Sequence, residues 1–91
     1  MPKWRNRAPT SYLQNFLVIF PNPLTSSSIL QLNTQLKDAE VVIYDILGKE
    51  MLRKTFSGNQ IDIERGHLES GIYFVQVRDG ERQWTQKVMV E

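Results

Sequence analysis

Residues 71–90 read GIYFVQVRDGERQWTQKVMV, and this stretch decides the fold. Apolar residues alternate with other residues on both sides of Asp79-Gly80, which is the pattern of strands with one buried face. An Asp-Gly pair favours the type I′ turn of a two-residue hairpin. The stretch therefore predicts two antiparallel strands, Gly71–Arg78 and Arg82–Val90. The side chains expected on the buried face are Tyr73, Val75, Val77, Trp84, Val88 and Val90.

The chain before this hairpin consists of short apolar runs separated by turn residues. Thr34–Asp38 is polar and Ser57–Asn59 contains Gly58, so both are predicted to be connections. Strands spaced by about 8–12 residues are typical of a β-sandwich. The sequence therefore predicts an all-β, antiparallel sandwich of about seven strands. The five further strands are expected at Leu17–Phe20, Ser28–Asn33, Glu40–Asp45, Lys49–Phe56 and Gln60–Glu64.

Residue patterns inside these segments predict how the strands lie. Glu40–Asp45 is apolar on both faces, as expected for a strand near the middle of a sheet. Gln60–Glu64 alternates, with Ile61 and Ile63 expected to point inward. Gly48 allows a positive φ in the tight turn that follows the central strand.

Composition bounds the class of protein. The chain has 91 residues, which supports one domain, and a net charge of +1. It has no cysteine, so disulfides and thiolate metal sites are excluded. The near-neutral charge argues against a protein that binds bare nucleic acid, which usually carries a strong basic excess. No apolar run approaches the roughly 20 residues that a membrane-spanning helix needs.

Residues 1–16 differ in character from the rest of the chain. They contain Lys3, Arg5 and Arg7 and no acidic residue, and they show no sustained hydrophobic period. We expect a flexible basic leader or linker there, with contact to nucleic acid or a membrane as the less favoured alternative. The apolar run Phe16–Phe20 is too short for a secretory signal. Residues 17–91 form the expected folded domain.

The segment before the hairpin predicts a tyrosine corner. In immunoglobulin-like sandwiches a tyrosine near the start of a late strand donates its hydroxyl to main chain upstream. Tyr73 fits this role, with Leu68 filling the end of the core and Gly71 allowing a tight turn. The alternative is an ordinary aromatic strand residue.

No catalytic, cofactor or metal site is predicted. His67 is the single histidine, and no cysteine or second histidine accompanies it as a ligand. Asp62 and Glu64 are interpreted as a solvated strand face, because acid–base work needs a cleft that separates their pKa values. A hydrolase built from Ser70, His67 and Asp62 has almost no support. A weak calcium site could be built from three acidic residues, Asp38, Glu40 and Asp45. Their spacing does not fit an EF-hand loop.

The last strand ends at the last residue of the sequence, Glu91. Its edge offers a surface to which a partner strand can pair, or through which two copies can dimerise. The alternative is a plain edge strand blunted by Arg82, Lys87 and Glu91. Physical reasoning alone leaves these two interpretations equal.

Several of these segments, in order, resemble one family. They are Pro21-Asn22-Pro23 after an apolar run, AEVVIYDILGK at 39–49, FSGN at 56–59, LESGIYFV at 68–75, and TQKVMV at 85–90. The chain is similar to the C-terminal sorting domain of the type IX (Por) secretion system of Bacteroidetes. The similarity covers about residues 17–91 and rests on the order and spacing of five motifs.

The resemblance implies an immunoglobulin-like sandwich of seven strands that serves as a non-catalytic address tag. Its partners would be the outer-membrane machinery, a sortase-like peptidase that removes the tag, and a preceding cargo. Cargo would pass through the periplasm to the outer membrane, the cell surface or the medium. The resemblance also implies which residues take part in sorting. They are Pro21, Asn22, Pro23, Gly48, Lys49, Gly71, Tyr73, Lys87, Val88 and Val90.

One departure from the family concerns the cargo, since about sixteen residues precede the domain in this sequence. We therefore expect a fragment or an orphan domain. The alternative function is an adhesion or carbohydrate-binding module of immunoglobulin or fibronectin type. Such a module is expected to expose a row of aromatic residues. Joint exposure of Trp84 and Phe74 would favour it.

Overall fold

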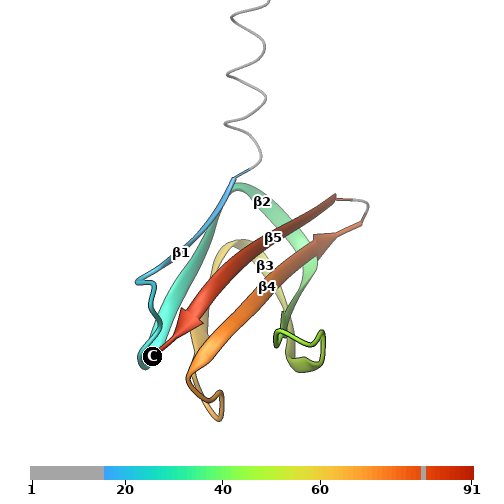
Figure 1. Ribbon diagram of the computed structural model, residues 1–91. Helices are drawn as coiled ribbons and strands as arrows, with labels where there is room; N and C mark the ends of the chain where they lie inside the picture. Colours follow the sequence, from blue (N-terminus) through green and yellow to red (C-terminus); the bar gives the residue numbers. More distant parts are fainter. Residues whose placement is uncertain (1–15, 81) are drawn as a thin grey trace, which may run out of the picture.

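A computed structural model describes residues 16–80 and 82–91, and it is all-β. Its five strands form one sheet, and every ladder between them is antiparallel. Figure 1 shows that the sheet is curled. The strand order is β1-β2-β4-β5. The remaining strand, β3, lies off this path and pairs with β2. The prediction of an all-β antiparallel fold is confirmed. The strands are β1 Leu17–Phe20, β2 Ser27–Tyr44, β3 Glu50–Glu64, β4 Gly71–Asp79 and β5 Arg82–Val90.

The expected number of about seven strands is wrong, because two pairs of predicted strands are continuous. β2 runs through the predicted connection Thr34–Asp38, and β3 runs through Ser57–Asn59. The pairing register between β2 and β3 shifts at these places, as β-bulges allow a strand to bend without leaving its ladder. The main-chain N–H of Asp38 donates to the Ser57 hydroxyl across the bend at 3.0 Å. The polar residues thus mark bends inside strands rather than chain reversals.

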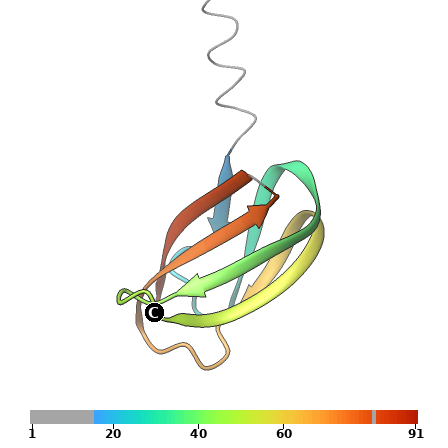
Figure 2. The same cartoon turned by 90° about the vertical axis from the view of Figure 1, so that its right-hand side faces the viewer.

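The two bends fold the sheet onto itself, as Figure 2 shows for β2 and β3. The first part of β2 pairs with β1 and with the end of β3, whereas its last part pairs with β4 and with the start of β3. The result is a curled half-barrel with the apolar side chains inside. Its core contains Ile19, Leu24, Leu30, Leu32, Leu36, Ala39, Val41, Ile43, Ile63, Leu68, Tyr73, Val75, Val77, Trp84, Val88 and Val90.

The inward faces predicted from alternation are confirmed. Ile63 is buried between exposed Asp62 and Glu64, as the period of two requires. Val42 points to the opposite side from its buried neighbours and is still only 2% exposed, because the long side chains of its cross-strand partners, Arg53 of β3 and Gln76 of β4, flank it on that face. This explains why the Glu40–Asp45 segment is apolar on both faces.

Turn chemistry also behaves as the sequence predicts at Gly48, which has a φ of +87°. The Asp45 carboxylate accepts the main-chain N–H groups of Leu47 at 2.9 Å and Lys49 at 2.8 Å. The N–H of Gly48 donates to the Asp45 carbonyl at 3.0 Å. An Asx-type turn therefore closes the hairpin between β2 and β3.

Candidate functional site

The corner before β4 confirms the interpretation of Tyr73. Its hydroxyl donates to the main-chain carbonyl of Glu69 at 2.8 Å, four residues upstream. The ring is buried beside Leu68, which fills the end of the core. The hydroxyl gives a carbonyl at the rim of the core its hydrogen bond, so the ring can stay inside.

The Pro-Asn-Pro segment packs against the end of β5. The side-chain oxygen of Asn22 accepts the main-chain N–H of Met89 at 3.0 Å. Leu24 donates its N–H to the Met89 carbonyl at 2.7 Å and accepts the N–H of Glu91 at 3.0 Å. Proline lacks an N–H, so the flanking prolines cannot donate to a ladder. The contact at Asn22 runs the other way, with its side-chain oxygen as the acceptor for β5. The first and last segments of the fold are thereby joined.

Arg65 ties three loops together at the same end of the molecule. Its Nε donates to the Leu68 carbonyl at 2.9 Å, and its Nη1 lies 3.5 Å from the Thr25 carbonyl. The same Nη1 donates to the main-chain oxygen of Glu91. Sequence reasoning missed this residue, because its partners Thr25 and Glu91 lie 40 and 26 residues away along the chain. No local pattern distinguishes Arg65 from a solvated loop arginine.

The structure brings eight of the ten predicted sorting residues together. Gly71 is the cross-strand partner of Val90, and Tyr73 is the partner of Val88. Lys87, on the outer face of β5, is exposed and faces Phe74 of β4, whereas Val88 and Val90 are buried. Pro21, Asn22 and Pro23 lie at the end of this hairpin.

The remaining two residues, Gly48 and Lys49, lie in a different turn. They belong to the hairpin between β2 and β3, which lies in the lower part of Figure 1 on the side away from β1. The turn follows the part of β2 that pairs with the start of β4, where Tyr44 is the partner of Phe74. Among the residues that the structure describes, no hydrogen bond links this turn to Pro21–Pro23 or to β5.

A hollow lies where the Pro-Asn-Pro segment meets the outer face of the β4–β5 hairpin. It encloses about 250 Å³ and is open to solvent. Its lining is mostly apolar, with one charged side chain. The lining residues are Asn22, Pro23, Ile72, Lys87 and Met89.

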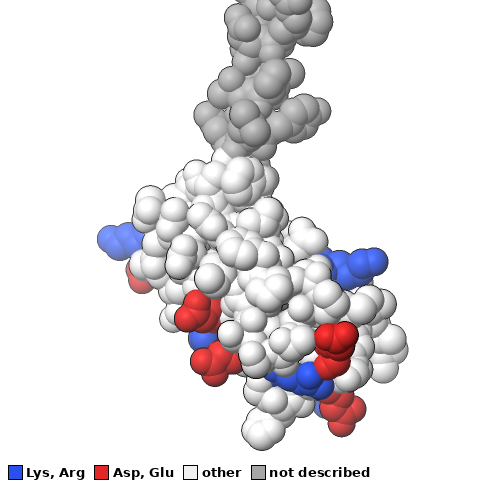
Figure 3. Space-filling model, turned by 90° about the vertical axis from the view of Figure 1, so that its left-hand side faces the viewer, with Lys and Arg blue, Asp and Glu red and all other residues white. Residues whose placement is uncertain are grey.

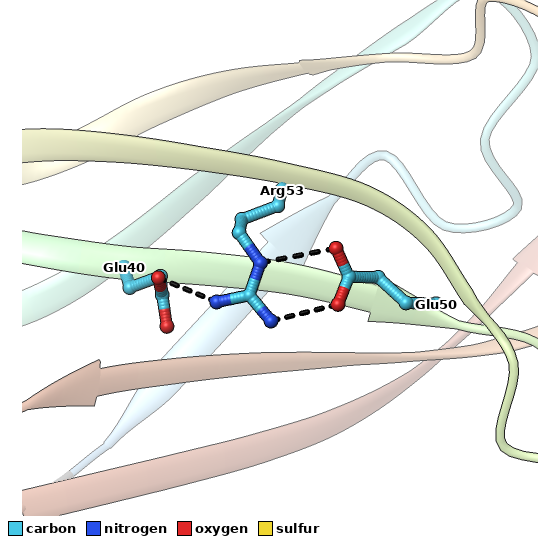
Figure 4. A network of polar contacts seen from close by, with 3 residues as sticks. All are labelled: Glu40, Glu50 and Arg53. Atoms are coloured by element: carbon cyan, nitrogen blue, oxygen red, sulfur yellow. Dashed lines mark hydrogen bonds and ion pairs between the residues drawn. The ribbon is translucent and has the colours of Figure 1, made fainter.

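A charged network on the outer side of β2 and β3 has a structural geometry rather than a catalytic one (Figure 4). Arg53 contacts Glu40 at 2.5 Å and both carboxylate oxygens of Glu50 at 2.7 and 3.0 Å. The hydrogen bonds from Arg53 hold the pKa of Glu50 below its usual range, and they raise the pKa of Arg53. The Glu50 carboxylate is therefore held in its ionised form, and Arg53 links its own strand, β3, to Glu40 of β2.

Catalytic and metal-binding arrangements find no support in residues 16–80 and 82–91. No hydrogen bond of this part joins Ser70, His67 and Asp62. No group of three or more His, Cys, Asp or Glu residues in it gathers to hold a metal ion. It also contains no helix long and apolar enough to cross a membrane.

Trp84 and Phe74, whose joint exposure would favour a carbohydrate-binding module, differ in burial. Trp84 faces the core and is 8% exposed, with the Arg82 guanidinium carbon 5.5 Å from its ring centre. Phe74 faces outward and is 37% exposed. The two rings lie on opposite faces of the sheet, so they cannot bind one sugar chain together.

The face that β1 occupies is largely uncharged in its upper part, and basic and acidic side chains alternate across its lower part (Figure 3). A nucleic-acid interface concentrates basic side chains. This face does not present such a concentration.

Comparisons with known proteins agree with the resemblance. Residues 18–91 match a family described as "Secretion system C-terminal sorting domain". The chain is also 32% identical over 75 residues to a protein named "Endo-acting ulvan lyase" from Formosa agariphila. That alignment covers 80% of this chain and 14% of the relative, so the chain spans only a small part of the relative's length.

Proposed function

This chain belongs to the family of secretion system C-terminal sorting domains, and we propose that the joined end of β5 and Pro21–Pro23 is the part that the sorting machinery reads. The family is that of the type IX (Por) system, in which the domain is a non-catalytic C-terminal sorting signal. Such a domain interacts with the secretion machinery and is carried to the cell surface or beyond as part of its cargo.

One observation carries this assignment of the recognition site. The main-chain N–H of Met89 is bound by the side chain of Asn22, so the two ends of the folded domain make one surface. A partner that binds this surface would recognise only the folded domain, because the contact joins residues 67 positions apart in the sequence. Such a signal would mark a domain that has finished folding.

The sorting residues divide into two roles under this proposal. Val88 and Val90 are buried and hold the end of β5 in place, together with Tyr73 at the corner. Lys87 and the Pro-Asn-Pro segment are presented to the partner. Gly48 and Lys49 shape the separate turn between β2 and β3 and would act away from this surface.

The finer steps of secretion are part of the same proposal. We propose that cargo precedes this domain and reaches the outer membrane through the periplasm. A sortase-like peptidase would then remove residues 17–91 as a unit, with residues 1–16 as the linker. The relative's far greater length supports this arrangement, because the matching segment is a small part of a larger protein.

The immunoglobulin-like sandwich also remains a proposal. The bends in β2 and β3 divide each strand into two pairing segments, and these with β1, β4 and β5 would supply the two layers. Self-association through the edge of β5 is the competing use of the surface, since β5 pairs with β4 alone among the strands of the described part of the chain.

Reporter export tests the function. Residues 17–91 would be fused behind a periplasmic reporter in a cell with a type IX system and in a strain lacking that system. We expect surface exposure of the reporter only in the first strain. Retention in the periplasm of both strains would overturn the function. Asn22→Ala, which removes the contact to Met89, should lower export, and Gln83→Ala on the exposed start of β5 serves as the matched control.

A further inference from the structure

The hollow beside the Pro-Asn-Pro segment has walls that the fold leaves exposed. Ile72 and Met89 are direct cross-strand partners on the outer face of β4 and β5, and they are 38% and 48% exposed. Phe74 follows Ile72 on the same face and faces Lys87 across the ladder. Contiguous exposed apolar side chains, unlike single ones, mark places where a partner binds.

The size of the hollow restricts its occupant. Pockets for drug-sized ligands have volumes of about 300–1,000 Å³ and bury most of the ligand. This hollow is smaller, at about 250 Å³, and it is open to solvent. It therefore suits one protruding side chain rather than an enclosed small molecule.

The polar groups of the hollow determine the charge of the occupant. The Asn22 side-chain oxygen already accepts the N–H of Met89, and Lys87 is the charged residue among those that line the hollow. Lys87 takes part in none of the ion pairs found within residues 16–80 and 82–91. A partner covering this ammonium removes water from it, which costs free energy unless an opposite charge compensates.

We propose that the hollow binds a protein segment that packs an apolar side chain against Ile72 and Met89 and places a carboxylate beside Lys87. This inference rests on the proposed function and names the chemistry of the partner at that site. The carboxylate supplies specificity, because a cationic segment would be repelled by Lys87.

An anionic membrane is disfavoured as the occupant. Recognition of anionic lipid uses clusters of about 4–8 basic residues. On the outer face of this sheet the acidic residues Glu40 and Glu50 accompany Arg53, so the charges are mixed. One lysine beside an apolar hollow fits a single acidic–apolar protein segment better.

Titration with small probes tests the inference on the full chain. Phenylbutyrate carries an apolar group and a carboxylate, whereas phenylbutyramide and phenylbutylamine carry a neutral and a cationic group. We expect amide NMR shifts around Ile72, Lys87 and Met89, with about millimolar affinity for the carboxylate and at least about threefold weaker binding of the other two probes. Equal binding of the three probes, or shifts spread over the whole domain, would overturn the inference.

A matched pair of lysine variants assigns the charge. Lys87→Gln should reduce phenylbutyrate affinity about threefold and leave phenylbutyramide unchanged. Lys37→Gln, at an exposed lysine of β2 outside the hollow, should change neither. The spectra also report whether each variant is folded. Equal losses in both variants would contradict a specific role of Lys87.

Two further measurements distinguish this inference from the proposed function. If the wild-type reporter is exported and Lys87→Glu is exported equally well, the inference fails while the sorting function stands. If the wild-type reporter is retained, the sorting function fails, and the probe titration still decides the chemistry of the hollow. Binding to phosphatidylglycerol vesicles that Lys87→Gln abolishes, without localised probe shifts, would replace the protein segment by a membrane and overturn the inference.

Discussion

The main-chain N–H of Met89 donates a 3.0 Å hydrogen bond to the side-chain oxygen of Asn22, which lies 67 residues earlier in the chain. Two main-chain hydrogen bonds of Leu24 continue this contact along β5. The Pro-Asn-Pro segment and the end of β5 are therefore one structural unit.

Asn22→Ala should destabilise the domain by about 1 kcal/mol, because the N–H of Met89 loses its acceptor. Urea unfolding measures this change, and hydrogen exchange at Met89 should accelerate more than exchange in β2. Gln83→Ala is the control. If the Met89 amide keeps its protection in Asn22→Ala, the contact does not hold the strand end.

Arg65→Ala should cost about 1–2 kcal/mol, since one guanidinium serves carbonyls in three loops. Arg65→Lys should recover only part of this loss, because an ammonium lacks the planar fork that reaches several carbonyls. Arg78→Ala removes an exposed arginine of β4 that makes no hydrogen bond or ion pair within residues 16–80 and 82–91, and it should be nearly neutral. Similar unfolding midpoints for Arg65→Ala and Arg78→Ala would contradict a stabilising role of the Arg65 hydrogen bonds.

Tyr73→Phe should cost about 1 kcal/mol, because the Glu69 carbonyl loses its donor while the ring keeps its packing. Tyr44→Phe removes a hydroxyl for which the structure gives no partner, and it should change stability little. Denaturant unfolding of both variants compares them. A larger loss in Tyr44→Phe would show that the corner is not stabilising.

Acid should weaken the Glu40–Arg53–Glu50 network. The pKa of Glu50 is lowered in the folded state, so its contribution is complete above the unfolded pKa and is lost as pH falls through the folded pKa. Thermal unfolding of the wild type and Glu50→Gln between about pH 7 and about pH 2 should show a difference that vanishes at the acid end. A difference that grows toward low pH would have the wrong sign.

Deletion of Lys87–Glu91 should abolish sorting, and it should also destabilise the fold. The deletion removes buried Val88 and Val90 and the partners of Leu24. Circular dichroism must therefore accompany the export assay, and Lys87→Glu separates recognition from folding. Unchanged export of the deleted protein would contradict the role of the terminal strand.

The sequence by itself determined the features that depend on neighbours in the chain. The period of two determined which side of β4 and β5 is buried. Asp79-Gly80 located their turn to within one residue, because Asp79 still pairs with Arg82 in the ladder. The tyrosine corner spans four residues, from Glu69 to Tyr73, so a local pattern could identify it. The sorting residues stay a prediction, which the resemblance carries over from motifs in their order along the chain.

Only the tertiary structure decided what depends on distant contacts. The polar residues near Asp38 and Gly58 predict turns locally, but pairing between β2 and β3 keeps both segments in the ladder and converts the turns into bends. Arg65 and the hollow beside Lys87 are assembled from segments far apart in sequence. Local patterns carry no information on such pairs, because their geometry exists only once the sheet has curled.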